Sequence, residues 1–256
     1  NFKDQFKGME YKDAMWKAAT CTTQREFEYH MKKIQDMDPD PDKQFANKWL
    51  RAIDPHLWSR SHFSSSSKCD TLVNNLNESF NGYILEARDK PIISMVEWIR
   101  KRLMTRYEIK RTGMEKYMGP ICPVIQEKLE KIKVDARNCF ANHAGQLRFE
   151  VDCGNTCHPV DLHARTCGCR VWDLTGIPCK HAISAICYHK LSPEDFVHPC
   201  YSKSTYMACY RAMINPVPGD HDWIETGLTP ILPPKYRKQT GRPKKLRRRA
   251  ADEPRN

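Results

Sequence analysis

Two short pairs of metal-binding residues stand close together in the second half of the chain. Cys167 and Cys169 flank one residue, and after a gap of nine residues Cys179 and His181 flank another. Thiolate and imidazole groups are ligands that Zn²⁺ prefers, and a closed structural site uses four of them in a tetrahedron, at about 2.0–2.3 Å. The spacing therefore predicts a zinc site whose metal contributes directly to folding.

The residues around the two pairs agree with a closed metal site. Gly176 and Pro178 lie between the pairs, and these turn residues can bring the second pair back onto the first. His181 opens a run of apolar residues at helical spacing: Ala182, Ile183, Ala185, Ile186 and Leu191. We therefore expect His181 in the first turn of a helix.

Two alternative roles for these cysteines stay open. The first is a set of buried thiols or a disulfide, although single-residue spacers in both pairs fit bridge geometry poorly. The second is a different ligand set that includes Cys153, Cys157 or His158. Residues 147–162, however, alternate as two short strands around a Gly-Asn turn, which predicts that Cys157 and His158 lie beside that turn.

Composition narrows the class of protein. The chain has 256 residues and twelve irregularly spaced cysteines, with no N-terminal apolar segment of a signal peptide and no apolar run approaching 18 residues. These features predict a soluble intracellular protein in a reducing compartment, of one or two domains and with no membrane partner. Because the first residue is Asn1 rather than Met, we expect a fragment of a longer product.

The excess positive charge is concentrated at the C-terminal end. The formal net charge is +11, and residues 235–256 contain ten basic and two acidic residues. This segment is poor in apolar residues, which predicts disorder in the free chain and salt-sensitive binding of nucleic acid. Its Gly-Arg-Pro core resembles an AT-hook, and a nuclear-import signal is the simpler alternative; both predict a nuclear location. The predicted DNA contacts are Arg242, Lys244, Lys245, Arg247, Arg248 and Arg249.

The first half of the chain is predicted to be helical. Apolar residues recur at helical spacing within 11–18, 27–37 and 45–53, with Thr22 and Thr23 as N-cap candidates, which favours an antiparallel helical array. Residues 54–70 are expected to be irregular. Further helices are expected near 73–87, 92–110 and 121–134, then from a start at 192–195, and finally near 203–214.

A second motif, NNLNESFN, lies in the helix expected near 73–87. Asn74, Glu78 and Asn81 share one helical face, apart from an apolar stripe. A carboxylate flanked by amides could help to hold a divalent metal beside other carboxylates. An ordinary solvated helix face is the simpler interpretation of the spacing.

Three stretches of the chain resemble a known family. NNLNESFNGYILEARDKPIISMVEWIRKRLM, WLRAIDPHLWSRSHF and VDLHARTCGCRVWDLTGIPCKHAISAI look like the C-terminal half of plant Mutator-like transposases, over most of residues 9–225. The zinc pattern is similar to that family's SWIM-type finger, C-x-C followed by C-x-H. The resemblance implies an RNase H-like catalytic domain, in which two aspartates and a glutamate bind two metal ions for DNA strand cleavage and joining. Glu78 matches that glutamate.

The same resemblance limits the expected activity. The two aspartates would lie upstream of Asn1, because Asp4, Asp13 and Asp36 fall in predicted helices rather than in strands. One glutamate cannot assemble a two-metal site. We therefore expect the isolated chain to be no enzyme, and Mg²⁺ to matter only in a complete parent transposase.

These observations predict an α+β chain that is mostly α. Residues 1–135 would be a helical part of an RNase H-like region, 136–215 a SWIM zinc module with a β-hairpin and helices, and 216–256 a disordered basic tail. The predicted function is zinc binding by a SWIM finger in a Mutator-like transposase-derived protein, with DNA as a partner and the module as a surface for protein contacts. A C-terminal fragment of an active transposase and a domesticated transcription regulator are the alternatives.

Overall fold

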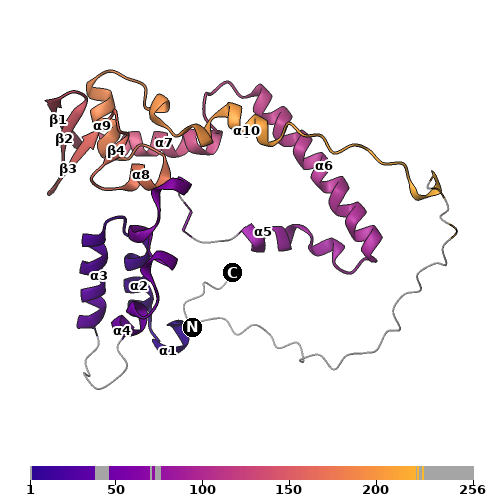
Figure 1. The fold of residues 1–256 in the computed structure, drawn as a ribbon, viewed down its shortest axis with the longest axis horizontal. Helices are drawn as coiled ribbons and strands as arrows, with labels where there is room; N and C mark the ends of the chain where they lie inside the picture. The colour runs from indigo at the N-terminus through magenta and orange to yellow at the C-terminus, as the bar shows by residue number, and fades with distance from the viewer. Residues whose placement is uncertain are drawn as a thin grey trace. The chain divides into compact units, whose positions relative to one another are not determined.

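The computed structural model describes residues 2–37, 46–69, 71–72, 76–222, 224 and 227. The chain divides into two units, Asn1–Ile214 and Asn215–Asn256. The first unit is mostly helical and contains one four-stranded antiparallel sheet, so the predicted α+β class is confirmed (Figure 1). The second unit begins one residue before residue 216, where the tail was predicted to start. The predicted domain boundary after residue 135 and the RNase H-like fold stay predictions.

The N-terminal helices enclose an apolar core of their own. They are α1 (Phe2–Gln5), α2 (Met9–Thr20), α3 (Gln24–Asp36) and α4 (Ala46–Arg51). Phe27, Met31 and Ile34 recur on one face of α3 and are buried in this core. Thr23 caps α3 in a capping box with Glu26, which confirms one of the two predicted N-caps.

An irregular segment follows these helices, as predicted. It consists of the 3₁₀ turns η1 (Pro55–Leu57), η2 (Arg60–His62) and η3 (Ser65–Ser67). Two buried serines fix it against α2, because the hydroxyl of Ser59 donates a hydrogen bond to the carbonyl of Ala18 at 2.9 Å and lies 2.8 Å from the hydroxyl of Ser61. Side-chain hydrogen bonds therefore hold these 3₁₀ turns against α2.

The helix predicted near 73–87 is interrupted in the structure. Helix α5 (Leu76–Tyr83) is followed by a separate 3₁₀ turn, η4 (Leu85–Ala87), and then by the long helix α6 (Ile92–Lys116). Helix α6 continues six residues past its predicted end. Its last turns hold few apolar residues but carry polar contacts at helical spacing, in which Glu108 accepts hydrogen bonds from Arg111 and Thr112.

The sheet lies in the second half of the unit. Helix α7 (Pro123–Ala136) leads into β1 (Cys139–Gly145), β2 (Arg148–Cys153), β3 (Thr156–Asp161) and β4 (Thr166–Cys167), which pair in chain order. The β2–β3 hairpin was predicted, and β1 and β4 were not. Most of β1 is exposed and lacks the alternation of a half-buried strand, and β4 has only two residues.

Short helices follow the sheet. Helix α8 (Val171–Thr175) is followed by α9 (Lys180–Tyr188), which packs on β1 and β2. The remaining elements are the 3₁₀ turns η5 (Pro193–Phe196) and η6 (Pro199–Tyr201), helix α10 (Lys203–Cys209) and the turn η7 (Asp220–Asp222). The predicted helix start at 192–195 is thus only a 3₁₀ turn, and α10 ends five residues early because residues 211–213 are exposed and bury no apolar face. None of the described helices is both long and apolar enough to span a bilayer.

A charged contact joins α7 to the segment after α9. Glu194 accepts hydrogen bonds from Lys133 at 2.7 Å and from Gln126 at 2.8 Å. Burial alone would raise the pKa of Glu194, but these hydrogen bonds and one from Ser192 outweigh it and lower the pKa to about 2. Since the folded-state pKa lies below its ordinary value of 4.5, the contact stabilises the fold at neutral pH and is lost as the pH falls from about 4.5 toward 2.

Replacing this carboxylate should therefore destabilise the protein at neutral pH. Glu194→Gln is expected to lower the free energy of unfolding at pH 7 by about 1–2 kcal/mol, measured by urea denaturation of the zinc-loaded chain. Glu127→Gln is the matched control, because Glu127 pairs with Lys131 on the exposed surface of α7, the helix that carries Lys133. This substitution should change the free energy of unfolding by less than about 0.5 kcal/mol. Equal effects of the two substitutions would show that the contact with Glu194 contributes no more than a surface ion pair.

Candidate metal centre

The two cysteine and histidine pairs meet at the junction of the sheet and the short helices. Cys167 ends β4, Cys169 lies in the turn before α8, Cys179 is the N-cap of α9, and His181 follows in the first turn of α9. Their ligand atoms all lie within 4.8 Å of one another. Each residue is at most 8 % exposed, so the structure brings the four predicted ligands together in a buried cluster.

Glycines shape both turns of this cluster. A Cβ on Gly168 would lie 2.8 Å from the Cδ of Pro159, and the Gly168 N–H donates a hydrogen bond to the Pro159 carbonyl at 2.8 Å. Only glycine allows the first pair to approach β3 this closely. Gly176 ends α8 in the left-handed conformation with φ of 73°, and so fulfils its predicted role as a turn residue.

The distances between ligand atoms match those of a tetrahedral site. The Nδ1 atom of His181 lies 3.7 Å from the sulfur of Cys167 and 3.8 Å from the sulfur of Cys179. With metal–ligand bonds of about 2.3 Å for sulfur and about 2.0–2.1 Å for nitrogen, the sulfur–nitrogen edge of a zinc tetrahedron is about 3.6 Å. The ring is therefore placed to bind zinc through Nδ1.

The electrostatics of the cluster also favour a cation. Hydrogen bonds from the Cys167 and Cys179 thiols hold the pKa of Cys169 far below its usual range. The same contacts raise the pKa of Cys167 to about 12 and that of Cys179 well above its ordinary value. Without a cation the buried site thus stabilises a single thiolate, whereas a divalent metal would stabilise three.

His181 is buried, and its Nε2 atom has no hydrogen-bond partner among the described residues. A bond from Nδ1 to zinc would leave the ring proton on Nε2, so the metal would not supply that partner. The ring packs against His158, with the ring centroids 4.4 Å apart.

A second group near His181 is less complete. Cys139, Cys153 and His181 also have ligand atoms within 4.8 Å of one another. Cys139 and Cys153 are cross-strand partners on β1 and β2, and their thiols are hydrogen-bonded to each other. This group offers three ligands where a structural zinc site needs four. Cys157 belongs to neither group, because it is exposed and its thiol contacts Glu150 at 3.2 Å.

The cluster of Cys167, Cys169, Cys179 and His181 thus holds a structural Zn²⁺. All four coordination positions are filled by protein, so the metal offers no open position for substrate or water. Its contribution is to folding, because it fixes β4, the turn before α8 and the start of α9 around one point. All twelve cysteines are free thiols, so the alternative of a disulfide at this site is not observed.

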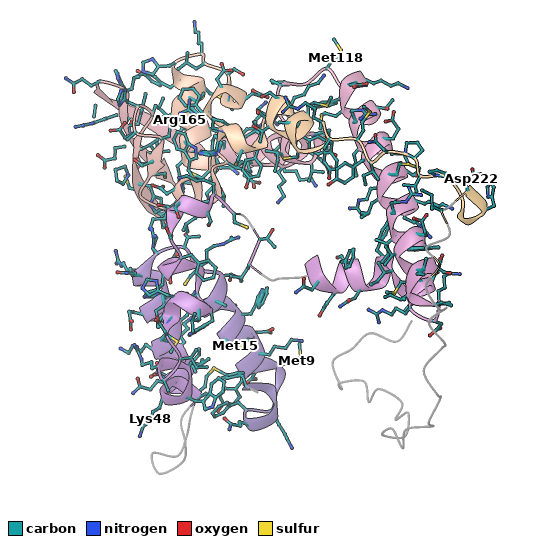
Figure 2. The ribbon with its side chains drawn as sticks, turned by 45° about the vertical axis from the view of Figure 1, so that its right-hand side comes forward. Met9, Met15, Lys48, Met118, Arg165 and Asp222 are labelled. Carbon is teal, nitrogen blue, oxygen red and sulfur yellow. The ribbon has the colours of Figure 1, made fainter. Side chains whose placement is uncertain are left out.

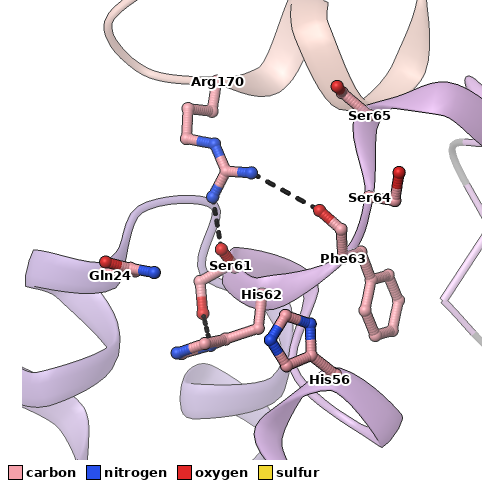
Figure 3. Close-up of a pocket in the computed structure, with 8 residues that line it drawn as sticks. All are labelled: Gln24, His56, Ser61, His62, Phe63, Ser64, Ser65 and Arg170. Carbon is pink, nitrogen blue, oxygen red and sulfur yellow. Dashed lines mark hydrogen bonds between the residues drawn. The ribbon is translucent and has the colours of Figure 1, made fainter.

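An arginine beside the cluster connects it to the N-terminal helices. Arg170 follows the ligand Cys169, has a left-handed backbone with φ of 59°, and donates hydrogen bonds to the carbonyls of Ser61 and Phe63 (Figure 3). It borders a cavity of about 610 Å³ that is also lined by His56 and His62. Because its donors are used by backbone carbonyls, the role of Arg170 is to position the segment rather than to bind a ligand.

Further hydrogen bonds strengthen the same connection. The hydroxyl of Thr22, just before α3, donates to the carbonyl of Cys169 at 2.7 Å. Lys68 donates to the carbonyl of Asp173 on α8 at 2.8 Å, and Tyr201 donates to the carbonyl of Lys68 at 2.6 Å. Residues 167–181 are therefore bonded directly to Thr22 and Lys68, and through Lys68 to Tyr201. These contacts use side chains that no sequence motif distinguishes.

The other predicted site residues lie away from this cluster or outside the described residues. Glu78 is exposed on α5 and belongs to no group of metal-binding side chains within the described ranges. Asn81 is also exposed on α5, and Asn74 lies outside the described residues. The predicted DNA contacts from Arg242 to Arg249 are outside them too, so these assignments stay predictions.

The comparisons with known proteins agree with the geometry of the cluster. The family model of the SWIM zinc finger matches residues 149–190, a span that runs from β2 to the end of α9 and contains all four ligands. No curated protein and no solved structure gives a significant match to the chain. The finger is thus shown, whereas the match covers too little of the chain to show the family of the whole protein.

Replacing one ligand should release the metal. The purified chain is expected to contain one zinc ion, and Cys179→Ser is expected to lose it and to unfold residues 160–190, because three ligands cannot close the tetrahedron. Zinc content is measured by metal analysis and local unfolding by hydrogen exchange. Cys187→Ser is the matched control, because Cys187 is an exposed thiol on the same helix, and its zinc content should be unchanged.

The opposite pattern would contradict the ligand assignment. Zinc that remains in Cys179→Ser but is lost from a Cys153→Ser or a Cys157→Ser variant would show that the ligand set includes Cys153 or Cys157 instead.

Proposed function

We propose that this chain is a zinc-stabilised DNA-binding protein of the Mutator-like transposase type, or a protein derived from such a transposase. The observation that carries the proposal is the buried SWIM finger, hydrogen-bonded to the rest of the chain through Arg170. Zinc has a structural role here, because it stabilises the fold of the finger. The finger fixes the arrangement of its surroundings, and DNA is bound by cationic side chains elsewhere in the chain.

Two features of the chain support the transposase type. The motif around Glu78 precedes the finger in the same order as in the family that the sequence resembles, and Glu78 lies on a helix, α5. Carboxylates before it also lie on helices, Asp13 on α2 and Asp36 on α3. Among the described residues, no group of three or more metal-binding side chains includes Glu78, and we propose that this chain does not cleave DNA by itself.

The charge distribution supports DNA as the partner. Residues 235–256 carry most of the formal net charge of +11. Lys and Arg side chains that neutralise phosphates release bound counterions, which gives affinity that falls steeply with salt. The same basic segment is consistent with a nuclear location, and protein partners of the finger remain a second part of the proposal.

The basic segment should dominate the binding of duplex DNA. Deleting residues 235–249 is expected to weaken duplex binding by at least about tenfold at 100 mM salt and to flatten its salt dependence, because most of the released counterions belong to phosphates that this segment neutralises. Fluorescence anisotropy with a labelled duplex measures both quantities, and zinc content is the control. Undiminished binding after the deletion would place the contact in the remainder of the chain.

Two single substitutions separate an AT-hook from a plain charged segment. Arg242→Ala is expected to reduce the preference for A·T-rich over G·C-rich duplexes more than Arg248→Ala does, because only Arg242 lies in the Gly-Arg-Pro core that enters a narrow minor groove. Both variants lose the same charge. Equal losses of preference would leave non-specific phosphate binding or nuclear import as the role of the segment.

The proposal also predicts an inactive chain. With Mg²⁺ or Mn²⁺ and DNA ends, the purified protein is expected to give no strand cleavage or joining on a sequencing gel, since one glutamate cannot hold two metal ions. Metal-dependent cleavage that disappears in Glu78→Gln would instead show that the described chain assembles a complete catalytic site.

A further inference from the structure

Helix α6 carries one side of a cationic groove. The cavity has a volume of about 670 Å³ and is formed by Tyr83 of α5 and by one face of α6. None of the residues that line it is acidic. The lining residues that define the groove are Tyr83, Trp98, Lys101, Arg102, Arg106 and Lys110. This volume lies within the range of about 300–1,000 Å³ for small-ligand pockets, so the groove has room for a nucleotide.

The cations and rings of the groove are arranged as a stack. The guanidinium of Arg102 lies 4.5 Å from the ring centroid of Trp98 and 5.6 Å from that of Tyr83, and the guanidinium of Arg106 lies 5.4 Å from Tyr83. The two rings are half-buried, with centroids 6.2 Å apart, whereas the two arginines are exposed. The rings therefore hold planar cations at the surface with their outer faces toward solvent.

The positive charge of the groove is only partly neutralised. Helix α6 contains seven Lys or Arg residues and three Glu residues. Two of those glutamates pair with arginines outside the groove, Glu97 with Arg100 and Glu108 with Arg111. Arg102 pairs with Glu86, an exposed partner that offsets little of its charge. Lys101, Arg106 and Lys110 form no ion pair with any residue that the structure describes.

This combination selects the chemistry of the ligand. Anionic phosphates suit the lysines and arginines, and an exposed base can stack on guanidinium and aromatic faces, as bases do in proteins that bind single strands. A duplex hides the faces of its bases, so it would use only the charge. A lipid surface would use exposed apolar side chains, whereas here the guanidinium groups lie against the rings of Trp98 and Tyr83, an arrangement that suits a planar base.

We propose that the groove between Tyr83 and helix α6 binds single-stranded DNA, with phosphates on Lys101, Arg106 and Lys110 and a base stacked against the Trp98–Arg102 pair. The site rests on the proposed DNA-binding function and deepens it, because it adds a contact for a separated strand that is distinct from the duplex contact of the basic tail. The two strands of DNA separate during DNA rearrangement. The groove would then hold a single strand, which the basic tail does not distinguish from a duplex.

The test uses the zinc-loaded chain with residues 235–249 deleted, so that the basic segment does not mask the groove. In this background Trp98→Ala and the double variant Arg102→Ala/Arg106→Ala are each expected to weaken binding of a fluorescent dT20 strand about tenfold, corresponding to the loss of one stacked base. Trp98→Phe keeps a stacking ring and is expected to restore most of the affinity.

A matched control tests whether the loss of affinity comes from this site or from the loss of positive charge in general. Lys32→Ala/Lys33→Ala removes the same charge from α3, and Lys33 also lies over an aromatic ring, 4.6 Å from the centroid of Tyr29. The cavity beside Lys33 is lined by Glu10, Asp13 and Asp36, so this control is expected to change dT20 affinity by less than about twofold. An equal loss in both double variants would overturn the groove as a specific site.

Crosslinking locates the contact without any substitution in the groove. Ultraviolet crosslinking of a 4-thiothymidine strand, followed by peptide mass spectrometry, is expected to label residues 83–110. Crosslinks confined to residues 231–256, or equal loss of affinity for a 20-base-pair duplex in the Trp98→Ala variant, would overturn the single-strand assignment. So would binding to phosphatidylserine vesicles that depends on Trp98 while dT20 binding does not. The tail's role in duplex binding is measured separately, so failure of either site leaves the other testable.

Discussion

The crowding of three cysteine sulfurs in a buried site is the constraint on which the second half of the protein depends. Each sulfur is within reach of the other two, and the hydrogen bonds among them favour one thiolate at Cys169 and two protonated neighbours. Burying three thiolates without a cation would be costly, whereas Zn²⁺ makes it favourable. The ligands come from β4, the following turn and α9. The bound metal therefore fixes the positions of the sheet and the helices where they meet.

The junction extends beyond the finger through backbone carbonyls. Cys169 accepts a hydrogen bond from Thr22, and Arg170, the next residue, donates to the carbonyls of Ser61 and Phe63. A residue adjacent to a metal ligand has little freedom to move while the metal is bound. Loss of zinc would therefore release Arg170 and weaken the attachment of residues 61–63, although none of these residues binds the metal. Arg165 lies in the same half of the chain (Figure 2) and makes a cation–π contact with Phe196, at 5.7 Å from the ring centroid.

The sequence predicted those features that depend on residue type and local spacing. A tetrahedral site demands particular ligands in close pairs, so the four zinc ligands could be read directly, as could the alternation of the β2–β3 hairpin. Strand β1 could not be found, because its side chains are mostly exposed and it is held by pairing with β2. Arg170 gave no signal either, since its partners are carbonyl groups that any residue at positions 61 and 63 would supply. The groove on α6 was not predicted from the sequence either, because a basic helix face is usually only a solvated surface.

The distribution of charge separates the two DNA contacts that we propose. Residues 235–256 account for most of the net charge, and the rest of the chain is nearly balanced as a whole, yet α6 by itself has four more basic than acidic residues. The remaining segments are therefore nearly balanced as a whole. Residues 235–256 are rich in charge and contain one aromatic residue, Tyr236, which suits a segment that follows a phosphate backbone. On α6 the cations are held against half-buried rings, and the proposed recognition of a base as well as a phosphate depends on that added geometry.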